Sequence, residues 1–367
     1  MHNNNHKTVL TLDAGGTNFV FSAIANNREV IKPICLPAYP DDLDRCLSSI
    51  VEGFSKVIEL LDIPPIAISF AFPGPADYIH GIIGDLPNFP AFRGGVALGP
   101  FLEEKFRIPV FINNDGNLFA YGEAIAGILP WINRELETAG NSRRYKNLLA
   151  VTLGTGFGGG VVIDGKLLLG DNGCGGDVWL SGNKYDHRLI AEEGVSIRAV
   201  RRVYQEISGD RTDYSPKEIF EIAEGTRDGD KNAAIKSFER LGEAAGYTIT
   251  EFLNIVDGIV VIGGGISNAN KYIIPALLKE MRGVRETMAG ATIPRLQMEV
   301  YNLEEECERA EFVMDESDKI QIPGGDGVAC YNMKKKTGVM ISKLGTNRAV
   351  SLGAYYFALS RLQRPLK

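Results

Sequence analysis

The feature that most constrains this sequence is a strand–turn–strand pattern that occurs twice. Val9–Phe21 (VLTLDAGGTNFVF) places an apolar strand, a carboxylate and a Gly-Gly-Thr turn before a second β-rich run. Ala150–Ile163 (AVTLGTGFGGGVVI) repeats the apolar strand, the Gly/Thr turn and the second strand. Two β-type runs joined by a short glycine-containing turn predict a hairpin, and glycines let backbone N–H groups approach an anion. The repetition therefore predicts a duplicated domain that binds a nucleotide.

Predicted strands alternate with predicted helices along the rest of the chain. Helical spacing of apolar residues covers 41–61, 98–106, 117–126, 190–207, 216–224, 232–254, 272–281 and 350–362, and strand-like runs cover 66–72, 110–112, 259–262 and 339–344. The polar segment 133–146 is predicted to be a surface linker, and 297–337 an inserted loop or a flap. The alternation predicts an α/β fold.

The length of 367 residues favours two domains. We expect an N-terminal α/β domain over 1–130, with the first glycine-turn hairpin. A C-terminal α/β domain over 131–367 would carry the second glycine-turn hairpin. The final helix is a candidate to pack back on the N-terminal domain.

Composition narrows the functional classes. The formal net charge of −7 argues against a nucleic-acid partner or an anionic membrane surface. The five cysteines are dispersed without a C-x-x-C pair, which is typical of free thiols in a reducing compartment. The longest apolar runs are strand-sized, too short for a bilayer, and no signal-peptide pattern opens the chain. The expected location is the cytoplasm.

Three glycine turns follow apolar strands: Gly15-Gly16-Thr17, Gly154-Thr155-Gly156 and Gly263–Gly265. Any one of them is typical of a tight turn that needs positive φ. All three together favour contacts with the phosphates and the nucleoside of a nucleotide. None matches the P-loop pattern or a G-x-G-x-x-G with an acidic partner, which weakens the P-loop NTPase and dehydrogenase hypotheses.

Asp115 is the best candidate for a reacting carboxylate. It follows an apolar strand in the run Asn113–Gly116, where α/β sheets place their ligands. A carboxylate there could accept the proton of a phosphoryl-acceptor hydroxyl. An Asn-Asp-Gly run is equally typical of a helix N-cap with an Asx turn, and spacing alone does not separate the two. Asn114 could hold a sugar hydroxyl or complete the turn.

Seven motifs taken together resemble the ROK family (repressors, uncharacterised proteins and sugar kinases). They are Leu12–Asn18, Phe72–Pro75, Leu86–Phe89, Asn114-Asp115 with Tyr121–Glu123, Leu153–Gly156, Val260–Gly265 and Ser351–Ala354, in the family's order over nearly the whole chain. The resemblance implies a glucokinase-like protein with the actin-like ATPase (ribonuclease H-like) fold. That fold has two α/β domains with mixed five-stranded sheets and a cleft that closes over sugar and ATP with Mg²⁺. It also implies a homodimer.

The resemblance assigns roles to individual residues. Asp115 would be the catalytic base for the sugar hydroxyl. Substrate-binding residues would be Gly74, Asn88, Asn114, Asp177 and Glu192. Residues around ATP would be Asp13, Gly15, Gly16, Thr17, Asn18, Gly154, Thr155, Gly156, Gly264 and Gly265, with Asp13 as the Mg²⁺ ligand.

One segment departs from the family pattern. Gly170–Leu180 (GDNGCGGDVWL) stands where family kinases carry G-x-x-G-x-A-G-E-x-G-H, followed by a cysteine cluster that binds structural zinc. Asp177 replaces the sugar-binding Glu, Leu180 replaces the His, and Ala191 holds the place of the last zinc cysteine. His187 is alone in this segment, and a lone His is more often a surface or core residue than a ligand. We therefore predict no zinc.

The favoured function is an ATP-dependent kinase that phosphorylates a hydroxyl of a hexose or an N-acylhexosamine. The alternative is a non-catalytic sugar sensor of the same family, because Asp177 and Leu180 replace the usual sugar ligands. Family repressors carry an N-terminal helix-turn-helix, whereas eight residues precede the first strand here and the charge is acidic. Direct DNA binding is therefore not expected.

Overall fold

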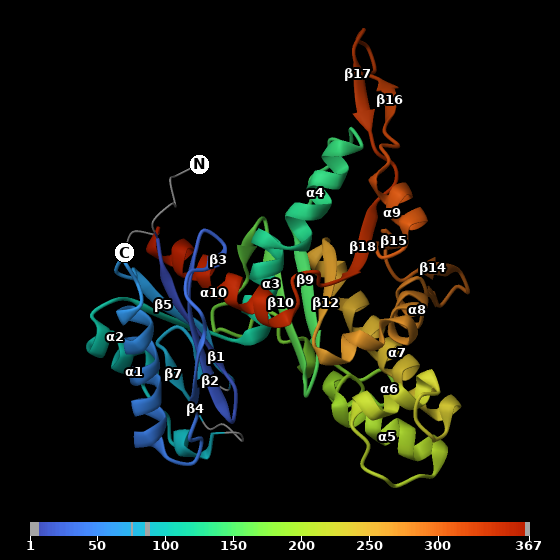
Figure 1. The fold of residues 1–367 in the computed structure, drawn as a ribbon. Helices are drawn as coiled ribbons and strands as arrows, with labels where there is room; N and C mark the ends of the chain where they lie inside the picture. The colour runs from blue at the N-terminus through green and yellow to red at the C-terminus, as the bar shows by residue number, and fades with distance from the viewer. Residues whose placement is uncertain (1–6, 75, 85–88, 364–367) are drawn as a thin grey trace. The chain divides into compact units, whose positions relative to one another are not determined.

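The computed structural model describes residues 7–74, 76–84 and 89–363. These residues form two compact units (Figure 1). The first unit lies within Met1–Gly127, Lys166–Gly176 and Leu344–Lys367, and the second within Ile128–Gly165 and Asp177–Lys343. The closing segment of the chain thus belongs to the first unit.

The sheet of the first unit begins with the predicted hairpin. β1 (Val9–Ala14) and β2 (Asn18–Ala25) pair antiparallel, with Asp13 opposite Val20. The sheet runs in the order β3-β2-β1-β5-β8, and β4 also pairs with β2. The remaining strands are β3 (Arg28–Glu29), β4 (Ile34–Pro37), β5 (Ala67–Ala71) and β8 (Val110–Asn113). Because β1, β5 and β8 are parallel neighbours, their carboxyl ends share one edge of the sheet.

Helices cover this sheet and bury aromatic side chains. They are α1 (Leu43–Glu59), α2 (Leu98–Phe106), α3 (Asp115–Ala126) and α10 (Thr346–Leu362), with the short pieces β6 (Ala76–Asp77), β7 (Ile82–Ile83) and η1 (Pro90–Phe92). α1 begins at its N-cap Asp42 and turns Cys46, Ile50, Phe54 and Val57 inward at helical spacing. Phe54 packs edge-on against the ring of Phe21, with ring centroids 5.1 Å apart. This cluster supports the hairpin that carries the first glycine turn.

The sheet of the second unit starts from the second predicted hairpin. β9 (Leu148–Leu153) and β10 (Phe157–Ile163) pair antiparallel. The order β10-β9-β12-β18-β15 continues with β12 (Ile259–Gly263), β18 (Lys336–Ile341) and β15 (Glu299–Asn302), all parallel to β9. β11 (Lys166–Leu167) follows β10 after the turn at Asp164-Gly165.

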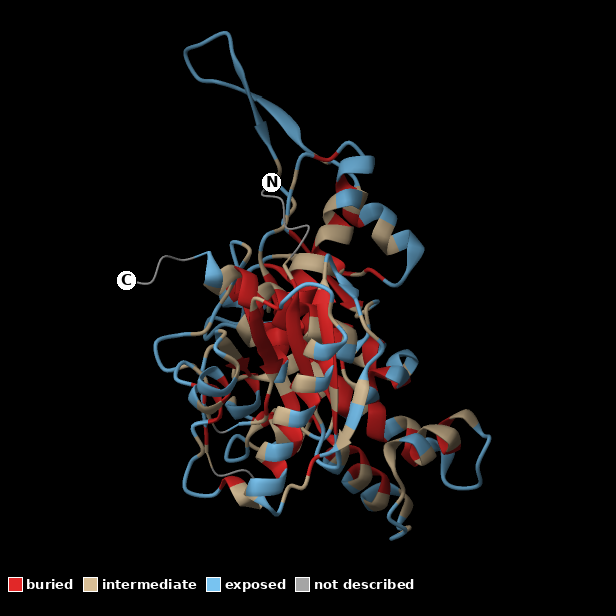
Figure 2. Ribbon diagram, turned by 60° about the vertical axis from the view of Figure 1, so that its left-hand side comes forward, coloured by how far each residue is buried: buried red, intermediate tan, exposed pale blue. Residues whose placement is uncertain are grey.

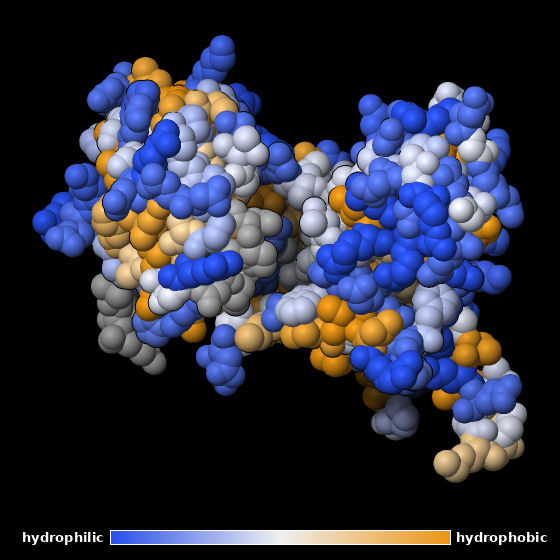
Figure 3. All heavy atoms as spheres, turned by 90° about the horizontal axis from the view of Figure 1, so that it is seen from below, coloured by the Kyte–Doolittle hydropathy of each residue, from blue (hydrophilic) through white to orange (hydrophobic). Residues whose placement is uncertain are grey.

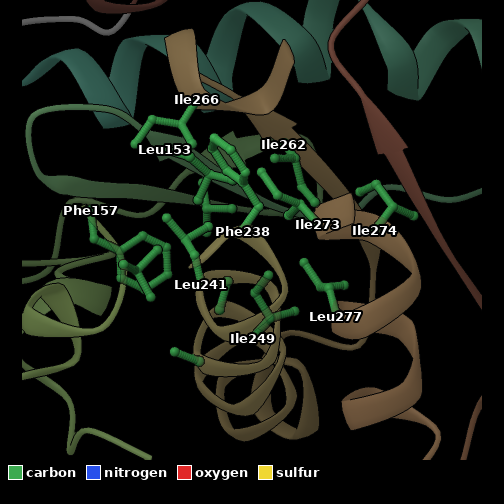
Figure 4. Packing of buried hydrophobic residues seen from close by; sticks show 14 of the residues in the cluster. Leu153, Phe157, Phe238, Leu241, Ile249, Ile262, Ile266, Ile273, Ile274 and Leu277 are labelled. Carbon is green, nitrogen blue, oxygen red and sulfur yellow. The ribbon is translucent and has the colours of Figure 1, made fainter. Parts of the chain in front are cut away.

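Two long helices supply much of the core of the second unit. α7 (Lys231–Val256) packs along α8 (Asn270–Met281). Figure 4 shows their side chains meeting those of the sheet, among them Phe238, Leu241, Ile249, Ile262, Ile273 and Leu277. α5 (Ile197–Ser208) and α6 (Pro216–Glu224) are amphipathic, and the surface around them is largely hydrophilic (Figure 3). Further elements are α9 (Glu306–Val313), η2 (Val178–Leu180), η3 (Ala191–Glu193), η4 (Gly265–Ala269), β13 (Val284–Glu286) and β14 (Thr292–Pro294).

Three expectations about elements were wrong. The predicted linker 133–146 overlaps α4 (Ile128–Thr138). The buried face of this helix consists of Ile128, Leu129, Ile132 and Leu136. Most of these apolar residues precede residue 133, so the prediction overlooked them. The predicted helix 190–207 is interrupted after η3, at Gly194.

The segment 297–337 is not one insertion, because β15 lies in the main sheet. What stands out is a hairpin of β16 (Asp318–Gln321) and β17 (Val328–Tyr331), which is exposed along its whole length (Figure 2). Among the residues that the structure describes, no helix combines the length and apolarity that a membrane span requires.

Candidate active site

In the first unit, three predicted site segments follow the carboxyl ends of adjacent parallel strands. Asp13 pairs in register with Ala71 of β5, and Ala71 pairs with Asn113 of β8. Gly74 follows β5, and Asn114-Asp115 follows β8. Neighbouring strands lie about 4.8 Å apart, so the backbones of Asp13 and Asn113 are about 10 Å apart. This edge of the sheet therefore collects the carboxylates that the sequence singled out.

Asp115 is the first residue of α3 rather than part of a loop. Asn114 is the N-cap, and its side chain accepts the N–H of Asn117 at 2.8 Å. The Asp115 carboxylate is solvent-exposed, and its Oδ1 accepts the N–H of Gly116 at 2.9 Å. The structure makes Asn114 the N-cap and leaves the Asp115 carboxylate open to solvent, so the N-cap does not compete with the proposed reacting role of Asp115. Negative charge is favourable at a helix N-terminus.

Two buried amides hold this turn, and sequence reasoning did not single them out. Asn113 Oδ1 accepts the N–H of Asn114 at 2.8 Å and Nδ2 of Asn117 at 3.2 Å. The carbonyl of Asn113 accepts the N–H of Phe72 at 3.0 Å, which joins the ends of β5 and β8. Asn113 and Asn117 can be recognised as supports of the turn only because they are buried. The local sequence does not show that burial.

The first glycine turn leaves room for an anion at one position. A Cβ on Gly15 would lie 2.8 Å from the carbonyl oxygen of Asn18, so the tight turn itself requires this glycine. A Cβ on Gly16 would meet no atom within 4 Å. Thr17 and Asn18 are exposed beside it. The open side of the turn is thus formed by Gly16 and Thr17.

Asp13 has a partner that sequence reasoning missed. Its Oδ2 accepts a hydrogen bond from Nδ2 of Asn347 at 3.4 Å, from the first turn of α10. The protein atoms around Asp13 remove water from its carboxylate and raise its pKa, although the residue still reaches solvent. Among the described residues, no cationic side chain pairs with it. A metal cation would compensate this desolvated charge.

The sugar residues predicted beside this edge are described only in part. Gly74 is exposed, and a Cβ there would lie 2.9 Å from the hydroxyl of Tyr78. That hydroxyl donates to the carbonyl of Phe72 at 3.0 Å, so Gly74 allows the loop to close on Tyr78. Asn88 lies outside the described residues.

In the second unit, hydrogen bonds to residues of the same unit hold the glycine turn between β9 and β10. The N–H of Gly154 donates to the carbonyl of Gly156 at 3.0 Å, and the carbonyl of Gly154 accepts the N–H of Ile197 at 3.0 Å. Oε2 of Glu192 accepts the N–H of Phe157 at 3.0 Å. A Cβ on Gly156 would lie 2.5 Å from the same oxygen. Thr155 remains exposed at the tip of the turn.

The third glycine turn packs directly on the second. Gly264 has a φ of +90°, and a Cβ there would lie 2.5 Å from the backbone nitrogen of Leu153. Gly263 pairs with Thr152 in the parallel ladder of β12 and β9. Gly265 opens η4, and a Cβ on it would meet no atom within 4 Å. The structure therefore brings the turns Gly154–Gly156 and Gly264-Gly265 close together.

The predicted sugar residues of the second unit lie at the start of η2 and in η3, two elements that are in contact. Asp177 is the N-cap of η2 and half-buried; burial raises its pKa, and a hydrogen bond from Trp179 opposes this. Glu192, in η3, also accepts Nη2 of Arg198 at 3.0 Å. Leu180, in the place of the family His, is 54% exposed.

The candidate residues thus form two groups, one on each unit. In the ranges that the structure describes, no three or more His, Cys, Asp or Glu side chains are grouped to hold a metal ion. The first group offers a carboxylate at a helix N-terminus and a desolvated Asp13 beside a glycine turn. The second offers two adjacent glycine turns next to Asp177 and Glu192. This chemistry suits phosphate binding and proton acceptance from a hydroxyl.

Comparison with known proteins supports the same chemistry. The model of the ROK family matches residues 9–290. The solved glucokinase of Parabacteroides distasonis is 57% identical, with a TM-score of 0.90, and the match covers 98% of this chain and 99% of that one. The glucokinase of Thermotoga maritima is 28% identical over 74% of this chain and 86% of its own length. An N-acetyl-D-glucosamine kinase of Photobacterium profundum is 28% identical over 70% and 83%. The fold is that of the actin-like ATPases.

Proposed function

Since this chain belongs to the ROK family, as its motifs predicted, we propose that it is an ATP-dependent sugar kinase. It transfers the γ-phosphoryl group of ATP to a hydroxyl of a hexose or an N-acylhexosamine. Similarity to glucokinases and an N-acetylglucosamine kinase supports this reaction class. The observation that carries the proposal is the register of β1, β5 and β8, which sets Asp13 and Asp115 at one edge of one sheet.

Asp115 is proposed as the general base. The sugar hydroxyl oxygen forms a bond to the γ-phosphorus while the bond from that phosphorus to the bridging oxygen of ADP breaks. The hydroxyl proton passes to the Asp115 carboxylate, and ADP leaves with the bonding electron pair. The exposed Asp115 side chain at the start of α3 can reach such a hydroxyl. Asn114, Gly74 and Asn88 are proposed to line the sugar.

The glycine turns are proposed to hold the nucleotide. Gly15, Gly16, Thr17 and Asn18 on the first unit, and Thr155 and Gly156 on the second, would direct backbone N–H groups at phosphate oxygens. Gly154, whose own N–H bonds within the turn, would leave room for the phosphates. Gly264 and Gly265 would contact the nucleoside. The open space at Gly16, Gly154 and Gly265, where a Cβ would meet nothing within 4 Å, agrees with a ligand approaching each turn.

Asp13 fits a magnesium ion that accompanies ATP. Its carboxylate is desolvated, and its described hydrogen-bond partner is the amide of Asn347. Mg²⁺ favours carboxylate oxygens together with substrate phosphates, and it neutralises the charge that develops on the transferred group. Asp13 would hold this ion, and Asn347 would orient the carboxylate.

Asp177 and Leu180 favour a second candidate, a sensor that binds sugar without turnover. Asp177 is one methylene shorter than the family Glu, and Leu180 cannot form the hydrogen bond of the family His. Each hydrogen bond lost to a sugar hydroxyl costs about 0.5–1.5 kcal/mol. This loss changes which sugar is preferred, whereas the base Asp115 is retained.

The deciding experiment measures ADP release with Mg-ATP against glucose, mannose, fructose, allose, N-acetylglucosamine and N-acetylmannosamine. Asp115→Asn is the control, because it keeps the shape of the side chain but cannot take the proton. We expect turnover on at least one sugar and a loss of about 10²–10⁴ in kcat in the variant. Sugar binding by calorimetry without ADP release on any of them would establish the sensor instead.

The proposal also includes a homodimer and no nucleic-acid partner. Sedimentation equilibrium tests the first expectation, with a mass near twice the 40.0 kDa of the chain as the expected result. A single-chain mass at micromolar concentration would contradict it.

A further inference from the structure

The segment that follows η2 lacks the side chains that would bind the structural zinc ion of the family. We call Ser181–Glu193 the clamp loop; its sequence contains one histidine and no cysteine. His187 is exposed. The carboxylate of Asp186 is occupied by Arg188, which donates from its backbone N–H and Nε at 3.0 Å each and from Nη2 at 2.7 Å. Zinc needs about four N, S or O ligands, and this donor set cannot supply them.

The clamp loop is closed by its own backbone instead. Gly182 and Ile190 pair antiparallel. The N–H of Ala191 donates to the carbonyl of Ser181 at 2.7 Å, and the N–H of Asn183 donates to that of Leu189 at 2.9 Å. These bonds join the two ends of the loop beside Leu180 and Ala191, which stand in the places of two zinc ligands of the family.

A buried amide fills the centre of the clamp loop. Asn183 is 4% exposed. Its Nδ2 donates to the carbonyl of Ile190 at 3.2 Å, and its Oδ1 accepts the N–H of Tyr185 at 2.9 Å. One side chain therefore bonds both arms of the loop. Such buried and satisfied polar groups favour one conformation.

Two side chains anchor the clamp loop to α7 and α8. Nζ of Lys184 lies 2.7 Å from Oε2 of Glu280 and 3.3 Å from Oε2 of Glu243. The hydroxyl of Tyr185 lies 2.8 Å from the same Oε2 of Glu243. Glu280 is paired on its other side with Arg295, whose side chain is 6% exposed.

The anchor combines a shielded ion pair with two more exposed partners, since Tyr185 is 53% exposed and the Glu243 side chain 38%. The Lys184 and Glu280 side chains are only 23% and 17% exposed. Burial disfavours the charge on Glu243, but the bonds from Tyr185 and Lys184 outweigh this and lower its pKa. Removing Lys184 would leave Glu280 with Arg295 as its remaining cationic partner. Losing a shielded ion pair still costs more than losing an exposed one.

Near its end, the clamp loop carries the side chain of Glu192, which contacts the glycine turn between β9 and β10. Glu192 lies in η3, directly after the closing bond of Ala191. Its Oε2 accepts the N–H of Phe157, and its Oε1 accepts Nη2 of Arg198. The conformation of the loop therefore sets where the Glu192 carboxylate lies against the turn Gly154–Gly156.

We propose that this chain replaces the family's structural zinc with a metal-free clamp, in which Lys184 and Tyr185 are positioning residues for Glu192. Ion pairs to α7 and α8, together with the buried amide of Asn183, hold the loop in one conformation in place of the metal. The kinetic consequence rests on the proposed sugar kinase function, whereas the metal-free structure of the loop does not.

The first test measures zinc and stability on the purified full chain. Elemental analysis is expected to find far less than one zinc per chain, and a zinc-selective chelator is expected to leave Tm unchanged. Lys184→Met is expected to lower Tm, while Lys217→Met, whose side chain is 85% exposed in a pair with Glu221, is expected to leave Tm unchanged. One zinc per chain together with a fall in Tm on chelation would overturn the clamp.

The second test separates positioning from simple stabilisation. Well below the Tm of the variant, Lys184→Met and Tyr185→Phe are expected to raise KM for the sugar about tenfold, equivalent to about 1.4 kcal/mol. Lys184→Arg, which keeps the positive charge, is expected to restore KM for the most part. A lower Tm with an unchanged KM for the sugar would refute the positioning role. If the wild-type chain phosphorylates no sugar, the proposed function fails, and the zinc and melting measurements still decide whether the clamp exists.

Discussion

At the scale of single residues, Asp13 shows how the fold gives an ordinary carboxylate unusual surroundings. It is the next-to-last residue of β1, accepts a hydrogen bond from Asn347 and loses part of its hydration. The pKa is raised because desolvation disfavours the charged form. A carboxylate in that state gains more from a bound cation than a fully hydrated one does.

The raised pKa of Asp13 predicts an acid-sensitive kcat/KM for Mg-ATP. The proton is retained to a higher pH than the ordinary value of 3.8, so the Mg²⁺-binding anion is lost earlier as pH falls. We expect kcat/KM for Mg-ATP to decline with falling pH before that for the sugar does. Asp13→Asn should reduce kcat/KM by roughly 10²–10³-fold at neutral pH.

Asp62→Asn is the matched control for this prediction. Asp62 is an exposed carboxylate of the same unit, just beyond α1. Its variant should keep the wild-type pH profile. An Asp13→Asn protein with unchanged kcat/KM for Mg-ATP would rule out Asp13 as the metal ligand.

At the scale of elements, α3 and α10 meet through glycines. A Cβ on Gly122 would lie 1.9 Å from the carbonyl oxygen of Ala349, and a Cβ on Gly353 would lie 1.9 Å from that of Leu118. The two helices therefore pack with their backbones nearly in contact. This packing carries the start of α10, and with it Asn347, to the edge of the sheet that holds Asp13.

Gly353→Ala should destabilise the first unit, because the added methyl group must push two backbones apart. Overpacking of this kind typically costs about 1–3 kcal/mol. Gly325→Ala is the matched control, since a Cβ there meets Ile322 at an ordinary 3.9 Å. Denaturant unfolding measures both. Equal midpoints for the two variants would contradict the close helix contact.

At the scale of the whole molecule, each unit has a buried apolar cluster of its own. Phe54 belongs to the cluster of the first unit, and Phe238 to that of the second. Units with separate cores can unfold separately, so a single two-state transition is not assured.

Calorimetry of core variants tests this separation. Phe54→Ala and Phe238→Ala remove fully buried rings, and such changes typically cost about 3–5 kcal/mol. We expect each variant to lower one of two thermal transitions and to leave the other in place. A single transition that moves equally in both variants would show that the two cores unfold as one.

Much of the fold could be predicted from the sequence because its signals are local. The two hairpins, α2 and α6 follow from apolar period, glycine turns and breakers. α4 was missed because its exposed half is polar, and β15 because it is short and flanked by charged residues. The candidate Asp115 was found from its place after a strand, whereas its supports Asn113 and Asn117 were not.

The sequence alone determined which local pieces form, which residues could bind phosphate or accept a proton, and that the loop Ser181–Glu193 carries one histidine and no cysteine. Only the tertiary structure decided the pairing of Asp13 with Asn347 and the anchoring of Lys184 on Glu280. These partners are separated by 334 and 96 residues. A hydrogen bond or an ion pair needs atoms within about 3–4 Å. At such separations along the chain, only the packing of helices on sheets brings them that close.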